Sequence, residues 1–202
     1  QLALRSGDLS AYRWITQLAY LTPDNMEAYR QLYTFLDAGR TAVAMVNSLG
    51  IVAVFWLARR LLDGRIALLA AFLLAIDPFF AGLSGLLHVD GLLSTWSILS
   101  LLLLALAAGL GERPSDSRPL IWSALSGCAA ALAILSKSPG VLLIAVAGLA
   151  YLSLLWREND MPIGRRVLKL AALAAVWLAA FLLLVLLLYP ALWSGPLQVL
   201  SY

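Results

Sequence analysis

Charged residues and cysteine are both scarce in this sequence. Charged side chains make up 12% of the 202 residues, whereas a typical soluble domain has about a quarter. Hydrophobic residues make up 62%, well above the share in a soluble domain. The single cysteine, Cys128, excludes an internal disulfide and, lying among alanines, is interpreted as a small hydrophobic residue. This composition predicts an integral membrane protein.

The pattern typical of a signal peptide is also missing from the start of the given sequence. Residues 1–40 lack the positive charge followed by an apolar stretch that marks one, and the first residue is Gln1 and not methionine. We therefore expect the sequence to be an internal piece of a longer protein.

Alternation of apolar and polar residues with period two is missing as well, which argues against a β-barrel. An apolar helix crosses a bilayer when it has about 17–25 residues. Six stretches rich in Leu, Ala and Val reach or approach this length: Thr41–Ala58, Ile66–Leu87, Gly91–Leu110, Leu120–Ser136, Pro139–Trp156 and Val167–Tyr189. The predicted fold is all-α, a polytopic transmembrane helical bundle of about six spans over residues 41–202.

The arginines between the spans indicate an orientation. They follow the first, third and fifth spans, whereas the alternate connections carry one cation, Lys137. Because Lys and Arg accumulate on the cytoplasmic side, the segments "HVD", "SKSPG" and "YPALWSGP" are predicted to face outward. Both ends of the chain are then outside as well.

Residues 1–40 are predicted to form an interfacial segment on the outer face. Thr22 and Pro23 mark a helix start, and tyrosines beside Trp14 are typical of a membrane interface. We expect two amphipathic helices lying on the outer leaflet, with an ordinary folded loop as the alternative.

The second span contains a helix break. Pro78 has no N–H to donate within a helix, and Asp77 directly before it is a good helix cap. We predict that one helix ends near Ile76 and that a short second helix runs from Pro78 to about Leu87. This short helix is expected to lie along the outer interface and to deliver His88 and Asp90 to the top of the next span.

Few ionisable residues are predicted to face outward, and these could carry chemistry. An imidazole, a carboxylate and an ammonium group on one face (His88, Asp90 and Lys137) could bind an anionic head group or transfer protons. Simpler interpretations remain open: Lys137 reaches lipid head groups, and His88 and Asp90 pair with each other or cap the third span. Tyr189 can equally be an interface anchor, and Asp77 is interpreted as a structural cap.

Three motifs occur in an order that resembles a known family. They are "AIDPFF" followed by "HVD", then "LSKSPG" with Ser136 where a threonine is usual, and then "YPALWSGPL". Over about residues 40–200 the sequence resembles bacterial phospholipid-carrier-dependent glycosyltransferases of the GT-C class. This class includes the protein O-mannosyltransferases and the aminoarabinose transferases of lipid A.

The resemblance implies a glycosyltransferase of the bacterial plasma (inner) membrane. A sugar on a polyprenyl-phosphate carrier would pass to a protein or lipid acceptor on the outer face, among membrane lipids and without nucleic acid. Lys137, with Ser138 and Tyr189, would bind the carrier phosphate, while Asp90 and His88 would have catalytic roles toward the acceptor or a phosphate-bound ion. No cofactor is certain; a divalent cation is possible, but no metal ligands are assigned.

The resemblance also implies that a catalytic acidic residue precedes Gln1. This base belongs to the family's first outer loop, so the sequence as given is expected to lack it. Two other classes stay open, a transporter or flippase of lipid-linked sugars and a structural subunit. A transporter is expected to show a repeat between its halves, and none is visible.

Overall fold

The described part of the chain is helical throughout. The computed structural model describes residues 26–86, 88–110, 118–157, 162–189 and 193, which contain no strand. The elements are α3 (Met26–Leu61), α4 (Gly64–Ile76), α5 (Pro78–Gly85), α6 (Val89–Ala107), α7 (Pro119–Ser136), the 3₁₀ helix η2 (Ser138–Val141), α8 (Leu142–Arg157) and α9 (Ile163–Leu188). Five helices are long and apolar enough to cross a membrane, and the bent pair α4–α5 makes a sixth span. The prediction of an all-α bundle of about six spans is confirmed.

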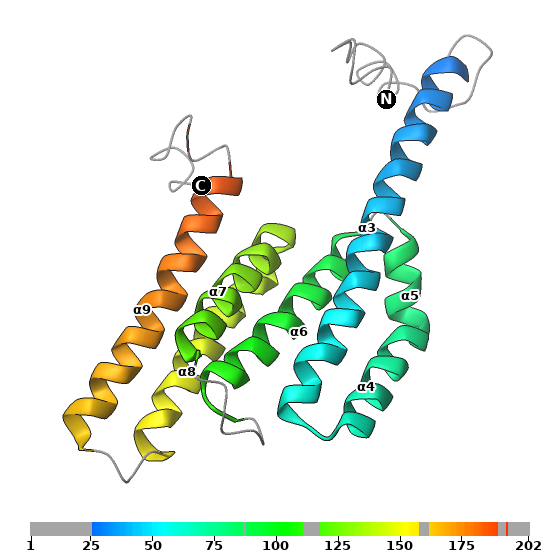
Figure 1. Cartoon of the computed structure of the whole chain (residues 1–202). Helices are drawn as coiled ribbons and strands as arrows, with labels where there is room; N and C mark the ends of the chain where they lie inside the picture. The colour runs from blue at the N-terminus through cyan, green and yellow to red at the C-terminus, as the bar shows by residue number, and fades with distance from the viewer. Residues whose placement is uncertain (1–25, 87, 111–117, 158–161, 190–192, 194–202) are drawn as a thin grey trace.

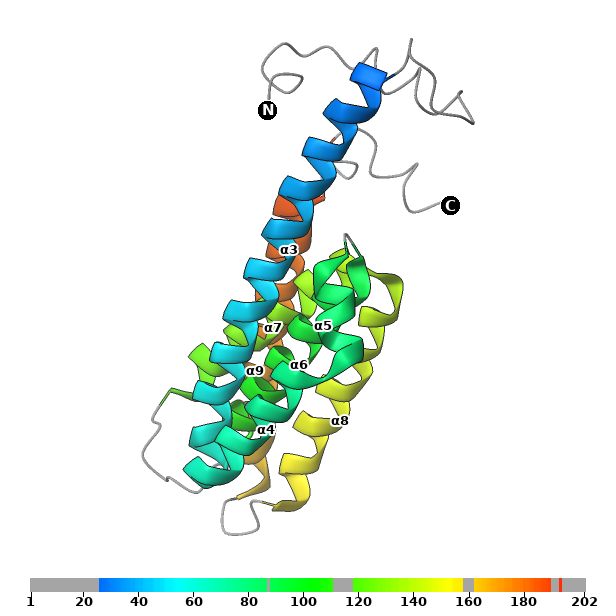
Figure 2. The same ribbon diagram turned by 90° about the vertical axis from the view of Figure 1, so that its right-hand side faces the viewer.

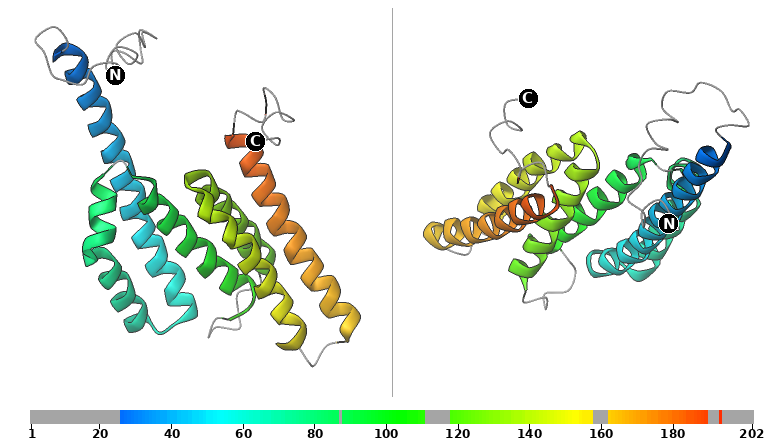
Figure 3. Two further views of the ribbon diagram at one scale, coloured as in Figure 1. Left: turned by 180° about the vertical axis from the view of Figure 1, so that it is seen from behind. Right: turned by 90° about the horizontal axis from the view of Figure 1, so that it is seen from above.

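The helices stand side by side in a bundle that α6 and α7 hold together (Figure 1). α6 packs against α3 on one side and against α7 on the other, and α9 packs against α7. α4 and α5 flank α3, and α8 packs against α9 and α6 (Figures 1 and 2). Seen along the bundle axis, the helices form an elongated group with α3 and α9 far apart (Figure 3).

Small residues of α7 bring the central helices close together. Ala130, Ala131 and Ala133 are fully buried. A Cβ atom at Gly127 would lie 2.3 Å from the backbone oxygen of Trp177 in α9, so only glycine fits there. Helices in a membrane associate through such small residues because lipid supplies no hydrophobic force between them.

The predicted break of the second span is confirmed. α4 ends at Ile76, α5 begins at Pro78, and the two helices are bent by 56°. Oδ1 of Asp77 accepts a hydrogen bond of 2.6 Å from the backbone N–H of Phe80, as expected of a helix cap.

The course of α5 differs from the prediction that it lies along the interface. α5 continues beside α3 toward the end of the bundle where α6 begins (Figures 1 and 2). The reason is length, because the 13 residues of α4 rise only about 20 Å of the roughly 30 Å that a span needs. The eight residues of α5 supply about 12 Å more.

The boundary predicted at residue 40 falls inside one continuous helix. α3 runs over 36 residues from Met26 to Leu61, and its N-terminal part extends beyond the other helices (Figure 2). No proline interrupts it, and the Thr41 hydroxyl donates to the backbone oxygen of Asp37, so the polar residues here are accommodated in the helix. Residues 26–40 are therefore not a separate amphipathic helix. The first predicted amphipathic helix, and the start predicted at Thr22, lie outside the described residues.

The arginine-bearing connections gather at one end of the bundle. The ends of α3, α6 and α8 and the starts of α4, α7 and α9 lie there (Figure 1). The guanidinium of Arg60 lies 5.2 Å from the ring centre of Trp122, and Nη1 of Arg166 donates to the Leu155 oxygen at 3.1 Å. The opposite end carries the start of α6 and the turn between α7 and α8.

Candidate functional site

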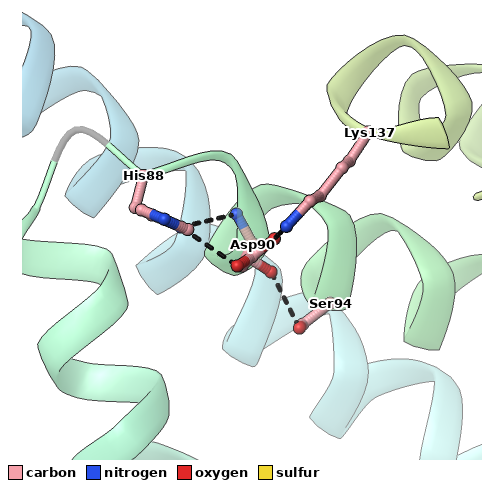
Figure 4. A network of polar contacts seen from close by, with 4 residues as sticks. All are labelled: His88, Asp90, Ser94 and Lys137. Atoms are coloured by element: carbon pink, nitrogen blue, oxygen red, sulfur yellow. Dashed lines mark hydrogen bonds and ion pairs between the residues drawn. The ribbon is translucent and has the colours of Figure 1, made fainter. Parts of the chain in front are cut away.

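Three ionisable side chains meet at the end of the bundle opposite the arginines. Nζ of Lys137 lies 2.5 Å from Oδ1 of Asp90, and Nδ1 of His88 lies 3.2 Å from Oδ2 of the same carboxylate (Figure 4). We call these three residues the HDK cluster. Each oxygen of the Asp90 carboxylate thus has its own positively charged or hydrogen-bonding neighbour.

The start of α6 positions His88 and Asp90. His88 is the N-cap and Asp90 the second residue of the helix, where a carboxylate is favoured by the exposed N–H groups and the helix dipole. The hydroxyl of Ser94, one turn later, donates to the backbone oxygen of Asp90 at 2.8 Å. The side chain of Asp90 is therefore carried by a regular, well-anchored first turn.

The contact between His88 and Asp90 supports two protonation arrangements. Nδ1 of His88 lies 3.3 Å from the backbone nitrogen of Asp90 and 3.2 Å from Oδ2 of Asp90. A ring nitrogen accepts a hydrogen bond when it has no proton and donates one when it has. Without a proton, Nδ1 of His88 accepts from the backbone N–H of Asp90, and with a proton it donates to the Asp90 carboxylate. In either arrangement the His88 ring keeps a hydrogen bond to Asp90, to its backbone N–H in one and to its carboxylate in the other.

The turn after α7 positions Lys137. Lys137 caps the C-terminus of α7, and its backbone N–H donates to the Ala133 oxygen at 3.0 Å. The chain then folds back at once through η2, where a Cβ atom at Gly140 would lie 2.5 Å from the backbone nitrogen of Ile134. This tight return directs the Lys137 side chain toward the start of α6 (Figure 4).

The other residues predicted for the site lie outside the HDK cluster. Ser138 is exposed at the start of η2, and Tyr189 follows the C-terminal end of α9 on the far flank of the bundle (Figure 1). Among the described residues, no hydrogen bond or ion pair joins either side chain to the cluster. Asp77 lies at the bend of the second span and acts as the cap that was predicted.

The side chains of the HDK cluster are partly exposed, and its Lys137–Asp90 ion pair can open. Relative exposures of the three side chains are 47% for His88, 29% for Asp90 and 44% for Lys137. An exposed ion pair holds its partners only weakly, so Lys137 can exchange the carboxylate for another anion. Within the described ranges, no group of three His, Cys, Asp or Glu side chains is placed to hold a metal ion.

A buried polar group below the cluster was missed by sequence reasoning. Asn47 of α3 is 1% exposed and bonds to Ser84 at 2.9 Å and to Thr95 at 2.7 Å. The signal was present, because a polar side chain inside a membrane span needs a partner there. An asparagine in the middle of the span Thr41–Ala58 could have been singled out on that ground.

One comparison with known proteins identifies a family. The family model described as dolichyl-phosphate-mannose-protein mannosyltransferase matches residues 36–193, a range that includes the whole HDK cluster and α4 to α9. No curated protein and no solved structure matches the chain. Since the family match covers most of the 202 residues, the chain belongs to the dolichyl-phosphate-mannose-protein mannosyltransferase family, whose members are membrane glycosyltransferases that use a lipid-linked sugar.

Proposed function

We propose that this chain carries the donor-phosphate site of a glycosyltransferase that uses a sugar on polyprenyl phosphate. The acceptor is a hydroxyl of a protein or a lipid. The observation that carries the proposal is the HDK cluster, which places an exchangeable lysine beside a carboxylate at one end of a bundle of membrane-spanning helices.

The side of the membrane is part of the proposal. The arginine-bearing connections lie together at the opposite end (Figure 1). Since arginines accumulate on the cytoplasmic side, the end with the HDK cluster faces outward, away from the cytoplasm of a bacterial plasma membrane. A sugar carrier already turned to the outer leaflet would reach the cluster from the lipid.

Lys137 is assigned to the phosphate of the carrier. In the transfer, the acceptor oxygen bonds to the anomeric carbon, and the bond from that carbon to the phosphate oxygen breaks. The carrier leaves as polyprenyl phosphate with an additional negative charge. An ammonium within about 4 Å of a phosphate interacts by roughly 4 kcal/mol near a protein surface, before desolvation and screening by solvent are subtracted.

Asp90 and His88 are assigned to the acceptor. When the phosphate binds Lys137 in place of Asp90, the Asp90 carboxylate keeps its contact with His88. The carboxylate oxygen that had contacted Lys137 can then accept a hydrogen bond from the acceptor hydroxyl. The proton of that hydroxyl passes to a separate carboxylate base, as the family resemblance implies. Asp90 and His88 therefore orient the acceptor on this scheme.

Transfer kinetics test the proposal. Lys137→Ala is compared with Lys169→Ala, which removes the sequence's other lysine near the start of α9 at the opposite end of the bundle. In membranes containing the natural protein, Lys137→Ala should raise KM for the polyprenyl-phosphate sugar by about tenfold, while Lys169→Ala leaves it unchanged. Equal KM values for Lys137→Ala and the parent protein would overturn the assignment.

A further inference from the structure

Asn47 forms a directional chain of hydrogen bonds that joins three helices. The Thr95 hydroxyl of α6 donates to Asn47 Oδ1 at 2.7 Å, and Asn47 Nδ2 donates to the Ser84 oxygen of α5 at 2.9 Å. The Ser84 hydroxyl in turn donates to the Phe80 oxygen at 2.8 Å. Because Ser84 already donates to Phe80, it accepts from Asn47, and this fixes which end of the amide faces which helix.

The two partners of Asn47 flank, in the sequence, two of the three cluster residues, His88 and Asp90. Ser84 precedes His88 by one turn's length of chain, and Thr95 follows Asp90 by somewhat more than one helical turn. Asn47 therefore holds Ser84 and Thr95, one on each side of His88 and Asp90. We call Asn47, Ser84 and Thr95, with their two hydrogen bonds, the clamp. His88, the N-cap of α6, and Asp90, in its first turn, lie between Ser84 and Thr95 in the sequence.

Close packing leaves the clamp little freedom. A Cβ atom at Gly91, the residue after Asp90, would lie 2.8 Å from Nδ2 of Asn47. A Cβ atom at Gly50 would lie 2.3 Å from Cγ2 of Thr95, so the Thr95 side chain rests directly on the backbone of α3. Asn47 and Thr95 are 1% and 2% exposed, which excludes solvent as an alternative partner.

We infer that Asn47 is a positioning residue of the transferase site. Through Ser84 and Thr95 it sets where the His88–Asp90 pair stands relative to Lys137, which comes from the separate turn after α7. Asn47 touches neither donor nor acceptor and acts only through the segment that it clamps. The inference rests on the proposed function of the HDK cluster, whose geometry it controls.

A structural role alone predicts a different pattern of effects. Hydrogen bonds between membrane helices commonly stabilise a bundle without touching its function. Ser100 provides the comparison, because it is equally buried in α6 and bonds to Ser126 of α7 at 3.1 Å, farther from the cluster than Thr95. If these hydrogen bonds only stabilised the bundle, loss of the Thr95 hydroxyl and loss of the Ser100 hydroxyl would affect stability and activity in the same way.

The experiment uses His88 as a reporter, since it is the sequence's sole histidine. The natural protein is prepared in lipid nanodiscs with isotope-labelled histidine, and the imidazole resonances are recorded by NMR. Thr95→Val keeps the shape but removes the hydroxyl, whereas Thr95→Ser keeps the hydroxyl and removes a methyl group. Ser84→Ala opens the clamp at its other, half-buried end, and Ser100→Ala is the control.

We expect Thr95→Val and Ser84→Ala to shift or split the His88 resonances and Thr95→Ser to restore them. Transfer kcat should fall about tenfold in the two clamp variants, less than the roughly 100-fold that a misplacement of about 1 Å can cost. Thr95→Ser should stay within about threefold of the parent, and Ser100→Ala should change the unfolding temperature alone.

Either of two results overturns the inference. One is an unchanged His88 spectrum and kcat in Thr95→Val and Ser84→Ala. The other is the same loss in Ser100→Ala or in Thr95→Ser as in Thr95→Val, which would mark a packing role. Failure of the proposed function is seen separately, because it would leave the KM of Lys137→Ala unchanged whatever the His88 spectrum shows.

Discussion

Lys137 and Asp90 form an ion pair at 2.5 Å although 47 residues separate them in the sequence. Asp90 belongs to the first turn of α6, and Lys137 to the turn that ends α7 (Figure 4). The pair is exposed, so it contributes little to folding and costs little to open. These are properties expected of a site whose lysine changes partner when an anionic ligand arrives.

Asp90→Asn is expected to reduce turnover while leaving the bundle intact. The amide keeps the size of the side chain but cannot balance the Lys137 charge or accept a hydrogen bond as strongly from an acceptor hydroxyl. Sugar transfer should show kcat lowered by about tenfold or more, with the unfolding temperature unchanged. An unaltered kcat would remove Asp90 from the acceptor role.

The orientation can be tested by labelling cysteines. In a Cys128→Ala background, Ser138→Cys and Gly64→Cys place thiols at the two opposite ends of the bundle, both at exposed positions. A Cβ atom at Gly64 meets nothing within 4 Å, so the substitution is tolerated sterically. In intact cells, a membrane-impermeant thiol reagent should label only Ser138→Cys. Labelling of Gly64→Cys alone would place the HDK cluster on the cytoplasmic side.

Asp77→Ala is expected to destabilise the bent second span. The substitution removes the carboxylate that accepts from the Phe80 N–H at the start of α5. Loss of such a cap should lower the free energy of unfolding by about 1 kcal/mol. Asp77→Asn keeps a capping oxygen and serves as the control in a detergent-unfolding titration. Equal losses in the two variants would show that the cap contributes nothing.

Gly127→Ala is expected to separate α7 from α9. Its added Cβ would lie 2.3 Å from the Trp177 oxygen, a backbone atom that cannot move by rotation of a side chain. Overpacking of this kind should cost about 1–3 kcal/mol of unfolding free energy. Gly148→Ala in α8 is the matched control, because a Cβ there meets nothing within 4 Å. A similar stability for both variants would contradict the close contact.

The helical spans and the break in the second could be predicted because they depend on local properties. Apolar length decides whether a segment crosses a bilayer, and Asp77–Pro78 ends one helix and starts the next by its own chemistry. The continuity of α3 across residue 40 was not predicted. Charged residues such as Asp37 and Arg40 mark a change of polarity, and a helix does not end at such a change unless its backbone is interrupted.

The distances within the site could not be predicted from the sequence. Arginine placement puts His88, Asp90 and Lys137 at the same end of the bundle, but only the packing of α6 on α7 decides whether they meet. Tyr189 shares the predicted side, but it follows α9, which packs on α7 and α8, and no hydrogen bond or ion pair among the described residues joins it to the cluster. The roles of these residues stay predictions.

Binding of the carrier phosphate tests the central claim most directly. Polyprenyl phosphate without sugar is titrated into nanodiscs that hold the parent protein, Lys137→Ala, Asp90→Asn or the double variant. If phosphate and Asp90 compete for Lys137, then Lys137→Ala should weaken binding by about tenfold. Asp90→Asn should bind at least as tightly as the parent, and the double variant should resemble Lys137→Ala. Binding that is insensitive to Lys137→Ala, or is lost equally in Asp90→Asn, would contradict the account.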